Sequence, residues 1–131
     1  MSILIGLHIK RTLEKDPDVA GFVGDRIFPI VMPQGVSTFP YICYDTNGQS
    51  GQRTKDGLVN DSASVSMGVI SKTYEDALVI ANSVRKAFDG KRTKYNEFSV
   101  KCTGVSYNDE YLSDFDAFAV NLNFDFETTD F

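Results

Sequence analysis

The side chains best suited to catalysis are few in this sequence and far apart along it. His8 is the only histidine, and Cys43 and Cys102 are the only cysteines. A catalytic Ser-His-Asp or Cys-His arrangement is built on a histidine beside the nucleophile, yet residues 5–15 around His8 contain no serine or cysteine. Structural zinc takes four such ligands, commonly with C-x-x-C spacing that is absent here. We therefore expect no enzyme activity and no metal.

Acidic residues gather in two stretches near the carboxyl end. The stretches comprise Asp109, Glu110, Asp114 and Asp116, and then Asp125, Glu127 and Asp130. Clustered carboxylates can bind a divalent cation or act as an acid–base pair. A solvated turn and the solvent face of a strand explain the two stretches more simply. The glycines form no phosphate-binding run between a strand and a helix, so we expect no catalytic residue and no cofactor.

Composition predicts a globular protein that binds neither membranes nor nucleic acid. The 131 residues are 42% hydrophobic and 24% charged, and the net charge is -5. No apolar run approaches the ~20 residues of a membrane-spanning helix, and the amino-terminal residues lack the pattern of a signal peptide. An acidic chain is poorly suited to bind phosphate backbones. We expect a cytoplasmic protein with both cysteines reduced and buried.

The first part of the chain predicts two helices. Residues 5, 9 and 13 are apolar at helical spacing, although residues 3 to 9 also alternate as in a strand, and we favour the helix. Asp16, Pro17 and Asp18 then supply a capping side chain, a proline at the first helical position and an acid in the first turn. This second helix is expected to end at Gly24 and to bury Val19, Phe22 and Val23.

Prolines and glycines interrupt the middle of the chain. Because proline lacks an N–H donor, a strand over residues 26–31 must be short or lie at a sheet edge. Residues 39–45 predict a regular strand. Residues 46–57, TNGQSGQRTKDG, have no aliphatic or aromatic side chain and three glycines, which predicts an exposed, mobile loop. Such a loop is either a plain connection or a segment that orders on a partner.

The second half of the chain predicts three strands and a helix. Residues 62–69 alternate between small polar and apolar side chains, as in a strand with one buried face. A helix begins at Thr73 and ends before Gly90. Its predicted buried stripe consists of Tyr74, Ala77, Leu78, Ala81, Val84 and Phe88. Residues 98–102 and 118–126 predict an antiparallel pair joined across a polar stretch at 108–110, with Asn121, Asn123, Asp125 and Glu127 facing solvent.

These elements together predict an α+β fold. We expect an antiparallel or mixed β-sheet of about four to five strands with two to three helices packed on it. The sequence has no internal repeat, low-complexity tract or proline-rich linker, so one domain over residues 1–131 is the simplest organisation.

One series of short motifs resembles a known family. Arg26-Ile27-Phe28-Pro29, Pro33-Gln34-Gly35 and Phe39-Pro40-Tyr41-Ile42 are similar to the R-I-[FY]-P, P-Q-G and P-Y-[IV] series of the tail-completion, or tail-terminator, proteins of long-tailed bacteriophages. The likeness extends to the Val19–Ile27 stretch, the strand around Val65–Val69 and the capped helix. The final strands match only as a pattern.

The resemblance implies a structural role in a phage tail. Such proteins form a ring, commonly hexameric, that caps the tail tube and joins it to the head-tail connector. The implied partners are further copies of the chain, the tail tube protein and connector proteins, first in the bacterial cytoplasm and then in the virion. The predicted interaction residues are Gln49, Gln52, Arg53, Lys55, Arg26 and Gln34. The alternative function is a small ligand-binding or regulatory α+β domain without catalysis.

Overall fold

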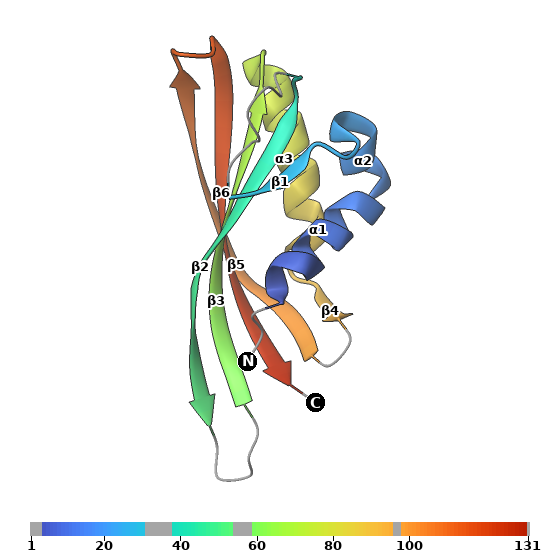
Figure 1. The fold of residues 1–131 in the computed structure, drawn as a ribbon, viewed down its shortest axis with the longest axis vertical. Coiled ribbons are helices and arrows are strands. Elements are labelled where there is room, and N and C mark those ends of the chain that lie inside the picture. Colours follow the sequence, from blue (N-terminus) through green and yellow to red (C-terminus); the bar gives the residue numbers. More distant parts are fainter. Residues whose placement is uncertain (1–3, 31–37, 54–58, 96–97, 131) are drawn as a thin grey trace.

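The chain folds into helices packed along one side of a long, twisted sheet (Figure 1). A computed structural model describes residues 4–30, 38–53, 59–95 and 98–130. The helices within these ranges are α1 (Ile5–Lys15), α2 (Pro17–Val23) and α3 (Tyr74–Phe88). The strands are β1 (Ile27–Pro29), β2 (Tyr41–Arg53), β3 (Val59–Ser71), β4 (Arg92–Tyr95), β5 (Phe98–Leu112) and β6 (Ala117–Asp130).

The strands form one mixed sheet in the order β1-β2-β3-β6-β5-β4. β1 runs parallel to β2, and the other neighbouring pairs are antiparallel. The predicted α+β class is confirmed, with six strands among the described residues in place of four to five. The expected short strand in the proline-rich region is β1, which has three residues and lies at the sheet edge.

Local signals in the sequence determine where the helices begin and end. The Asp16 carboxylate accepts hydrogen bonds from the backbone N–H groups of Asp18 (3.0 Å) and Val19 (3.2 Å), and α2 ends before Gly24 at φ +60. Thr73 caps α3 in the same way. The favoured helix over the first fifteen residues is confirmed as α1. None of the described helices combines the length and apolarity needed to cross a membrane.

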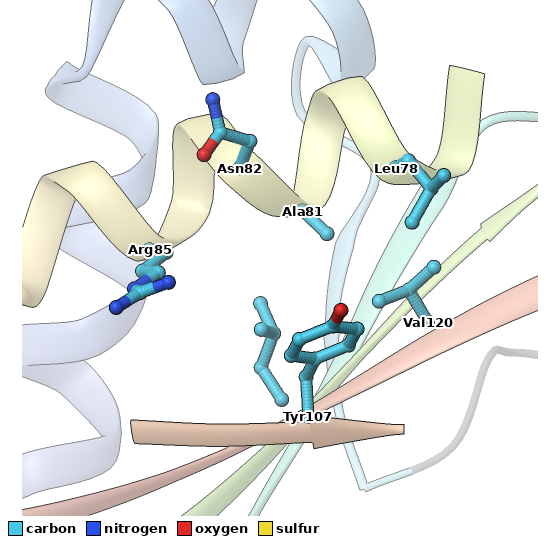
Figure 2. Close-up of a pocket in the computed structure, with 7 residues that line it drawn as sticks. Leu78, Ala81, Asn82, Arg85, Tyr107 and Val120 are labelled. Carbon is cyan, nitrogen blue, oxygen red and sulfur yellow. The ribbon is translucent and has the colours of Figure 1, made fainter. Parts of the chain in front are cut away.

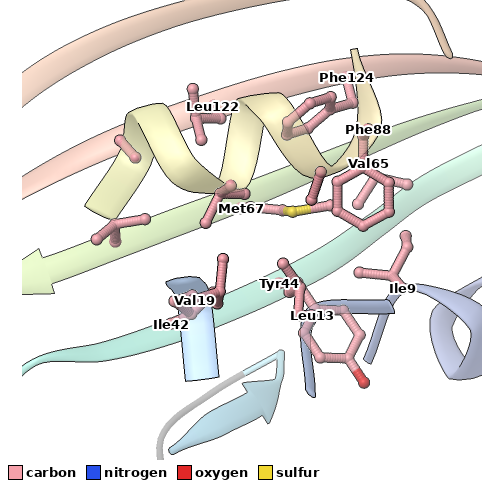
Figure 3. Packing of buried hydrophobic residues seen from close by; sticks show 14 of the residues in the cluster. Ile9, Leu13, Val19, Ile42, Tyr44, Val65, Met67, Phe88, Leu122 and Phe124 are labelled. Carbon is pink, nitrogen blue, oxygen red and sulfur yellow. The ribbon is translucent and has the colours of Figure 1, made fainter. Parts of the chain in front are cut away.

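The main core lies between the helices and one face of the sheet, which we call the covered face (Figure 3). The alternation predicted for β3 and β6 is confirmed, because Val65, Met67 and Phe124 are buried there. Phe88 of α3 packs edge-on against Phe124, with ring centroids 5.5 Å apart. Two predicted core residues are in fact exposed: Phe22 at 41% and Tyr74 at 44%.

A smaller apolar cluster lies at one end of the opposite face. Its buried members are Tyr41, Ile70, Ala117 and Ala119. The Phe39 ring packs 5.4 Å from that of Tyr41, and the Lys72 ammonium lies 4.7 Å above the Phe39 ring. The remainder of this face carries small and polar side chains.

Two predicted connections are strands in the structure. Residues 46–53 of the expected 46–57 loop belong to β2, which pairs with β3 up to Arg53, while residues 54–58 lie outside the described residues. The polar stretch at 108–110 belongs to β5. Both errors have one cause, since backbone hydrogen bonds to a neighbouring strand can hold a strand without apolar side chains. The pairing partner is not visible in local composition.

Candidate assembly interface

His8 is a buried structural contact between α1 and β4. Its Nε2 atom lies 2.7 Å from the Thr93 hydroxyl oxygen. Burial, followed by the positive charge of Arg11, lowers the pKa of His8 below its usual value. The contact between the neutral imidazole and the threonine hydroxyl holds α1 against β4, which is the strand at one edge of the sheet.

Both cysteines are reduced, as predicted, but only Cys102 is buried as expected. Cys102 is buried, and Cys43 is half-buried. Burial raises the pKa of the Cys102 thiol, whose sulfur lies 3.7 Å from the Gly104 carbonyl oxygen. A thiol with a raised pKa is a weak nucleophile, so Cys102 acts here as a small core side chain.

The carboxylates near the β5–β6 turn bind tyrosine hydroxyls. Tyr74 of α3 donates to Asp109, and Tyr111 donates to Asp116. These hydrogen bonds raise the pKa of both tyrosines. Among the described residues, no three His, Cys, Asp or Glu side chains are grouped so that they could hold a metal ion. The acidic stretch is thus a solvent-exposed network of hydrogen bonds.

A shallow groove separates α3 from the carboxyl-terminal half of β5 (Figure 2). Its volume is about 200 Å³, which is below the roughly 300–1,000 Å³ of a small-molecule site. Seven residues line it: Leu78, Ala81, Asn82, Arg85, Tyr107, Val120 and Leu122. Next to it, the rings of Tyr74 and Tyr111 flank Phe118 at centroid distances of 5.7 and 5.2 Å. The groove is better suited to side chains of another polypeptide than to an enclosed ligand.

The sheet face opposite the main core, which we call the open face, is covered by no described helix (Figure 1). Its centre is a set of small and polar residues on neighbouring strands: Ser62, Ser64, Ser66, Gly68, Ser106, Asn108, Asn121, Asn123, Asp125 and Glu127. Cross-strand hydrogen bonds order it, such as Ser66 to Asn123 (3.1 Å) and Asn121 to Glu110 (3.3 Å). The predicted outward orientation of Asn123, Asp125 and Glu127 is confirmed.

Both outer edges of the long strands are partly open. β4 pairs only with residues 98–101 of β5, and no described strand pairs with the outer edge of residues 103–112. Likewise, β1 pairs only with residues 42–44 of β2, which leaves the outer edge of residues 45–53 without a neighbouring described strand. Open strand edges present unpaired N–H and C=O groups that can bind a further strand.

The six predicted interaction residues do not lie together in one described surface. Arg26 is engaged inside the fold, because its Nε donates to the Pro40 carbonyl oxygen (2.8 Å) and its guanidinium also donates to the Phe22 carbonyl oxygen (3.3 Å). Gln49, Gln52 and Arg53 lie on β2 rather than on a loop. Gln34 and Lys55 lie outside the described residues.

The Arg26 contact gives the motif series a structural explanation. Ile27 of the first motif pairs directly with Ile42 of the third, and Arg26 binds the carbonyl oxygen of Pro40. Two segments separated in sequence thus form the β1–β2 contact. The first and third motifs are therefore part of the fold, while the second motif lies outside the described residues.

The sequence reasoning missed the exposed tyrosines of β5. Tyr107 and Tyr111 are 62% and 52% exposed beside the groove. A signal for them exists, because residues 105, 107, 109 and 111 continue a period-two pattern after the irregularity between Cys102 and Gly104. That bulge shifts the alternation by one residue and hides the strand from a simple pattern search.

Comparison with known proteins identifies the fold but not a family. No protein-family model and no curated protein sequence matches the chain. Among solved structures, a chain described as "Virion of native gene transfer agent (GTA) particle" is similar, with a TM-score of 0.69 and 15% sequence identity. The match covers 92% of this chain and 91% of that chain. At this identity, the likeness shows a shared fold along nearly the full length of both chains.

Proposed function

We propose that this protein is a structural component of a phage-like virion, which assembles into a hexameric ring that caps the tail tube and joins it to the head-tail connector. Its partners are other copies of itself, the tube protein and connector proteins. It acts in the bacterial cytoplasm during assembly and then in the virion tail. The fold shared with a gene transfer agent virion chain and the tail-completion-like motif series support this role.

The observation that carries the proposal is the contrast between the two sheet faces. Three helices cover one face with a continuous apolar core, and the other face carries serine, asparagine and carboxylate side chains. A ring around a DNA passage needs an inner wall that does not bind DNA. Carboxylates repel phosphates, and small polar side chains give little area for apolar contact. The open face carries the carboxylates Asp45, Glu110, Asp125 and Glu127, and its cations Arg92, Lys94 and Lys101 lie towards the edge formed by β4 and the adjoining part of β5. The centre of this face, away from that edge, has the required chemistry.

The test is the mass and shape of the purified protein. Light scattering on a sizing column across a concentration series should show a species of six times 14.5 kDa, or about 87 kDa, at high concentration. Micrographs of that fraction should show closed rings with a central hole, and mixing with tail tubes should produce capped ends. A strict monomer that also leaves tube ends uncapped would overturn the proposal.

A further inference from the structure

We infer that copies of this chain join by strand pairing, in which the outer edge of β5 over residues 103–112 binds the outer edge of β2 over residues 45–53 of the next copy. This inference rests on the proposed ring and identifies the contact that closes it. The occupant of each open edge is a second copy of this chain.

The free backbone groups of β5 belong to residues on the same sheet face as the groove, including Tyr107, which lines it. The Cys102 N–H donates to the Lys91 carbonyl oxygen (3.2 Å), so the Cys102 backbone points away from β6. Cys102 is paired with Phe126. Because hydrogen-bonded and non-hydrogen-bonded pairs alternate along an antiparallel ladder, the partners of Phe124, Leu122, Val120 and Phe118 also point outward. These partners are Val105, Tyr107, Asp109 and Tyr111.

The same alternation identifies the free groups of β2. Ile42 donates its N–H to the Arg26 carbonyl oxygen, and the Tyr44 carbonyl accepts from Ile30, so even-numbered residues of this part of β2 point away from β3. A register shift between Thr46 and Gln49 changes which residues point outward, from even-numbered before it to odd-numbered after it. Gln49, opposite Ala63, therefore directs its backbone outward, as do Gly51 and Arg53. Each edge thus offers donors and acceptors at alternate residues over about the same length.

The directions of β2 and β5 allow the two edges to form an antiparallel pair between neighbouring copies. β2–β3, β3–β6 and β6–β5 are antiparallel pairs, so β2 and β5 run in opposite directions at the two sides of the sheet. Rotation about a ring axis preserves direction, and β5 of one copy therefore meets β2 of the next as an antiparallel pair. Two different surfaces are used, which is the heterologous contact that a closed ring requires.

The two edges are offset along the strands. Gly51 aligns through Asp61 with Thr128 of β6, whereas Tyr107, whose backbone also points outward, aligns with Leu122, six residues away. At 3.3 Å per residue the offset is roughly 20 Å, and four strands spaced 4.8 Å apart are roughly 19 Å wide. Copies without an axial shift then have strands inclined by roughly 46° to the ring axis, close to the tilt of about 35–45° in closed sheets.

Charge favours a second copy as the occupant of the β5 edge. Residues 105–131 contain seven acidic side chains and no lysine or arginine, and the start of α3 adds the exposed Glu75 and Asp76. Residues 45–53 of β2 contain one acid, Asp45, and one base, Arg53. On the same side of the sheet as α3, the outward face of α1 carries three bases, Lys10, Arg11 and Lys15, and one acid, Glu14. Complementary charge of this kind selects and orients a partner.

The open part of the β5 edge lacks lysine and proline, two of the residues that commonly protect an edge strand against pairing. Isolated edge strands commonly carry lysine, proline or a covering segment. Residues 103–112, TGVSYNDEYL, contain no lysine, arginine or proline, and the bulge lies at the start of the open part. Tyr107 and Tyr111 instead present large exposed rings beside the groove. Such an edge is suited to β-strand addition, with the groove accepting side chains of the added strand.

Disulfide cross-linking between two different variants tests this contact directly. Cys43→Ala and Cys102→Ala provide a background without thiols, and one protein then carries Gln49→Cys or Arg53→Cys while the other carries Tyr107→Cys or Asp109→Cys. Circular dichroism and thermal unfolding verify that each variant is folded. The matched control replaces the β5 variant by Glu127→Cys, since Glu127 is exposed on the open face of an inner strand. Light scattering of the same samples records ring formation.

The expected result is a mixed disulfide between a β2 variant and a β5 variant, formed at least about tenfold faster than with the control, since pairing raises the effective thiol concentration. A chain carrying both cysteines should give a ladder that ends at the ring size. Equal rates with the control, or β5–β5 disulfides as the main product, would overturn the inference. Rings without the mixed disulfide refute only the strand contact, whereas the mixed disulfide in open-ended chains refutes the capping ring.

Discussion

The two faces of the sheet use the same strands for different purposes. On β6, Phe124 is fully buried under α3, while Asn123 and Asp125 beside it face solvent. On β3, Val65 and Met67 are buried, and Ser64 on the opposite side is exposed. The covered face therefore provides the stability of the fold. Apart from its small apolar cluster around Tyr41 and Ile70, the open face buries little apolar surface, which leaves its polar side chains available for selection by function.

Adjacent residues on β6 should give the largest contrast in stability. Phe124→Ala removes a ring packed between Phe88 and Phe126, and we expect a loss of about 3–5 kcal/mol in the free energy of unfolding. Asn123→Ala, one residue along on the open face, should change it by less than about 0.5 kcal/mol. Urea unfolding followed by circular dichroism measures both. Equal losses would remove the distinction between the faces.

Arg26 tests whether the motif series serves the fold or an interface. Its guanidinium binds the carbonyl oxygens of Pro40 and Phe22, so Arg26→Ala should cost about 1.5–3 kcal/mol, as expected for hydrogen bonds to a charged group. Arg26→Lys, which keeps the charge but not the planar donors, should recover only part of this. Thermal unfolding provides the measurement. Wild-type stability combined with loss of assembly would assign Arg26 to an interface instead.

His8 should make the stability of the fold depend on pH. Its pKa is lowered in the folded state, so the unfolded chain binds the proton more readily. Stability is then fully present above the unfolded pKa of about 6.5 and declines as pH falls below it. Thermal unfolding between about pH 7.5 and 5.5 should show this decline. His8→Gln, a neutral replacement, should flatten the profile over that range, and an unchanged profile would contradict the assignment.

Charge reversal on the open face should have the smallest effect on folding. Asp125 and Glu127 are exposed, so Asp125→Lys with Glu127→Lys should change the free energy of unfolding by less than about 0.5 kcal/mol. The rings should instead gain salt-dependent binding to DNA, because the new cations displace counterions from phosphates. A filter-binding assay across a salt series detects this. Lys101→Glu, a reversal of opposite sign on β5, serves as the control and should add no DNA binding.

Much of the fold could be predicted because its signals are local. The cap at Asp16, the capping threonine of α3, and the alternation of β3 and β6 each lie within a few residues. Phe22 and Tyr74 were misassigned because helical spacing gives a periodicity but not the edge of the buried stripe. The end of β2 was misassigned because its order comes from pairing with β3 across the sheet.

The candidate interface depends on information that a single sequence does not carry. Whether an edge is open follows from strand order, and strand order follows from pairing between distant segments. Tyr107 and Asp109 are unremarkable in the sequence, yet the bulge after Cys102 sets which side of the sheet they occupy. Gln49 and Arg53 were predicted from composition as loop residues, and the structure gives them a different context, the outer edge of β2.

The most direct test of the account is a reconstruction of the assembled protein by electron cryomicroscopy. We predict a closed ring in which the open face, with Asp125 and Glu127, lines the lumen and the three helices lie outside. Neighbouring copies should be joined edge to edge through β5 and β2. A ring with the helices in the lumen, or an assembly in which the open face is buried against another subunit, would contradict the account.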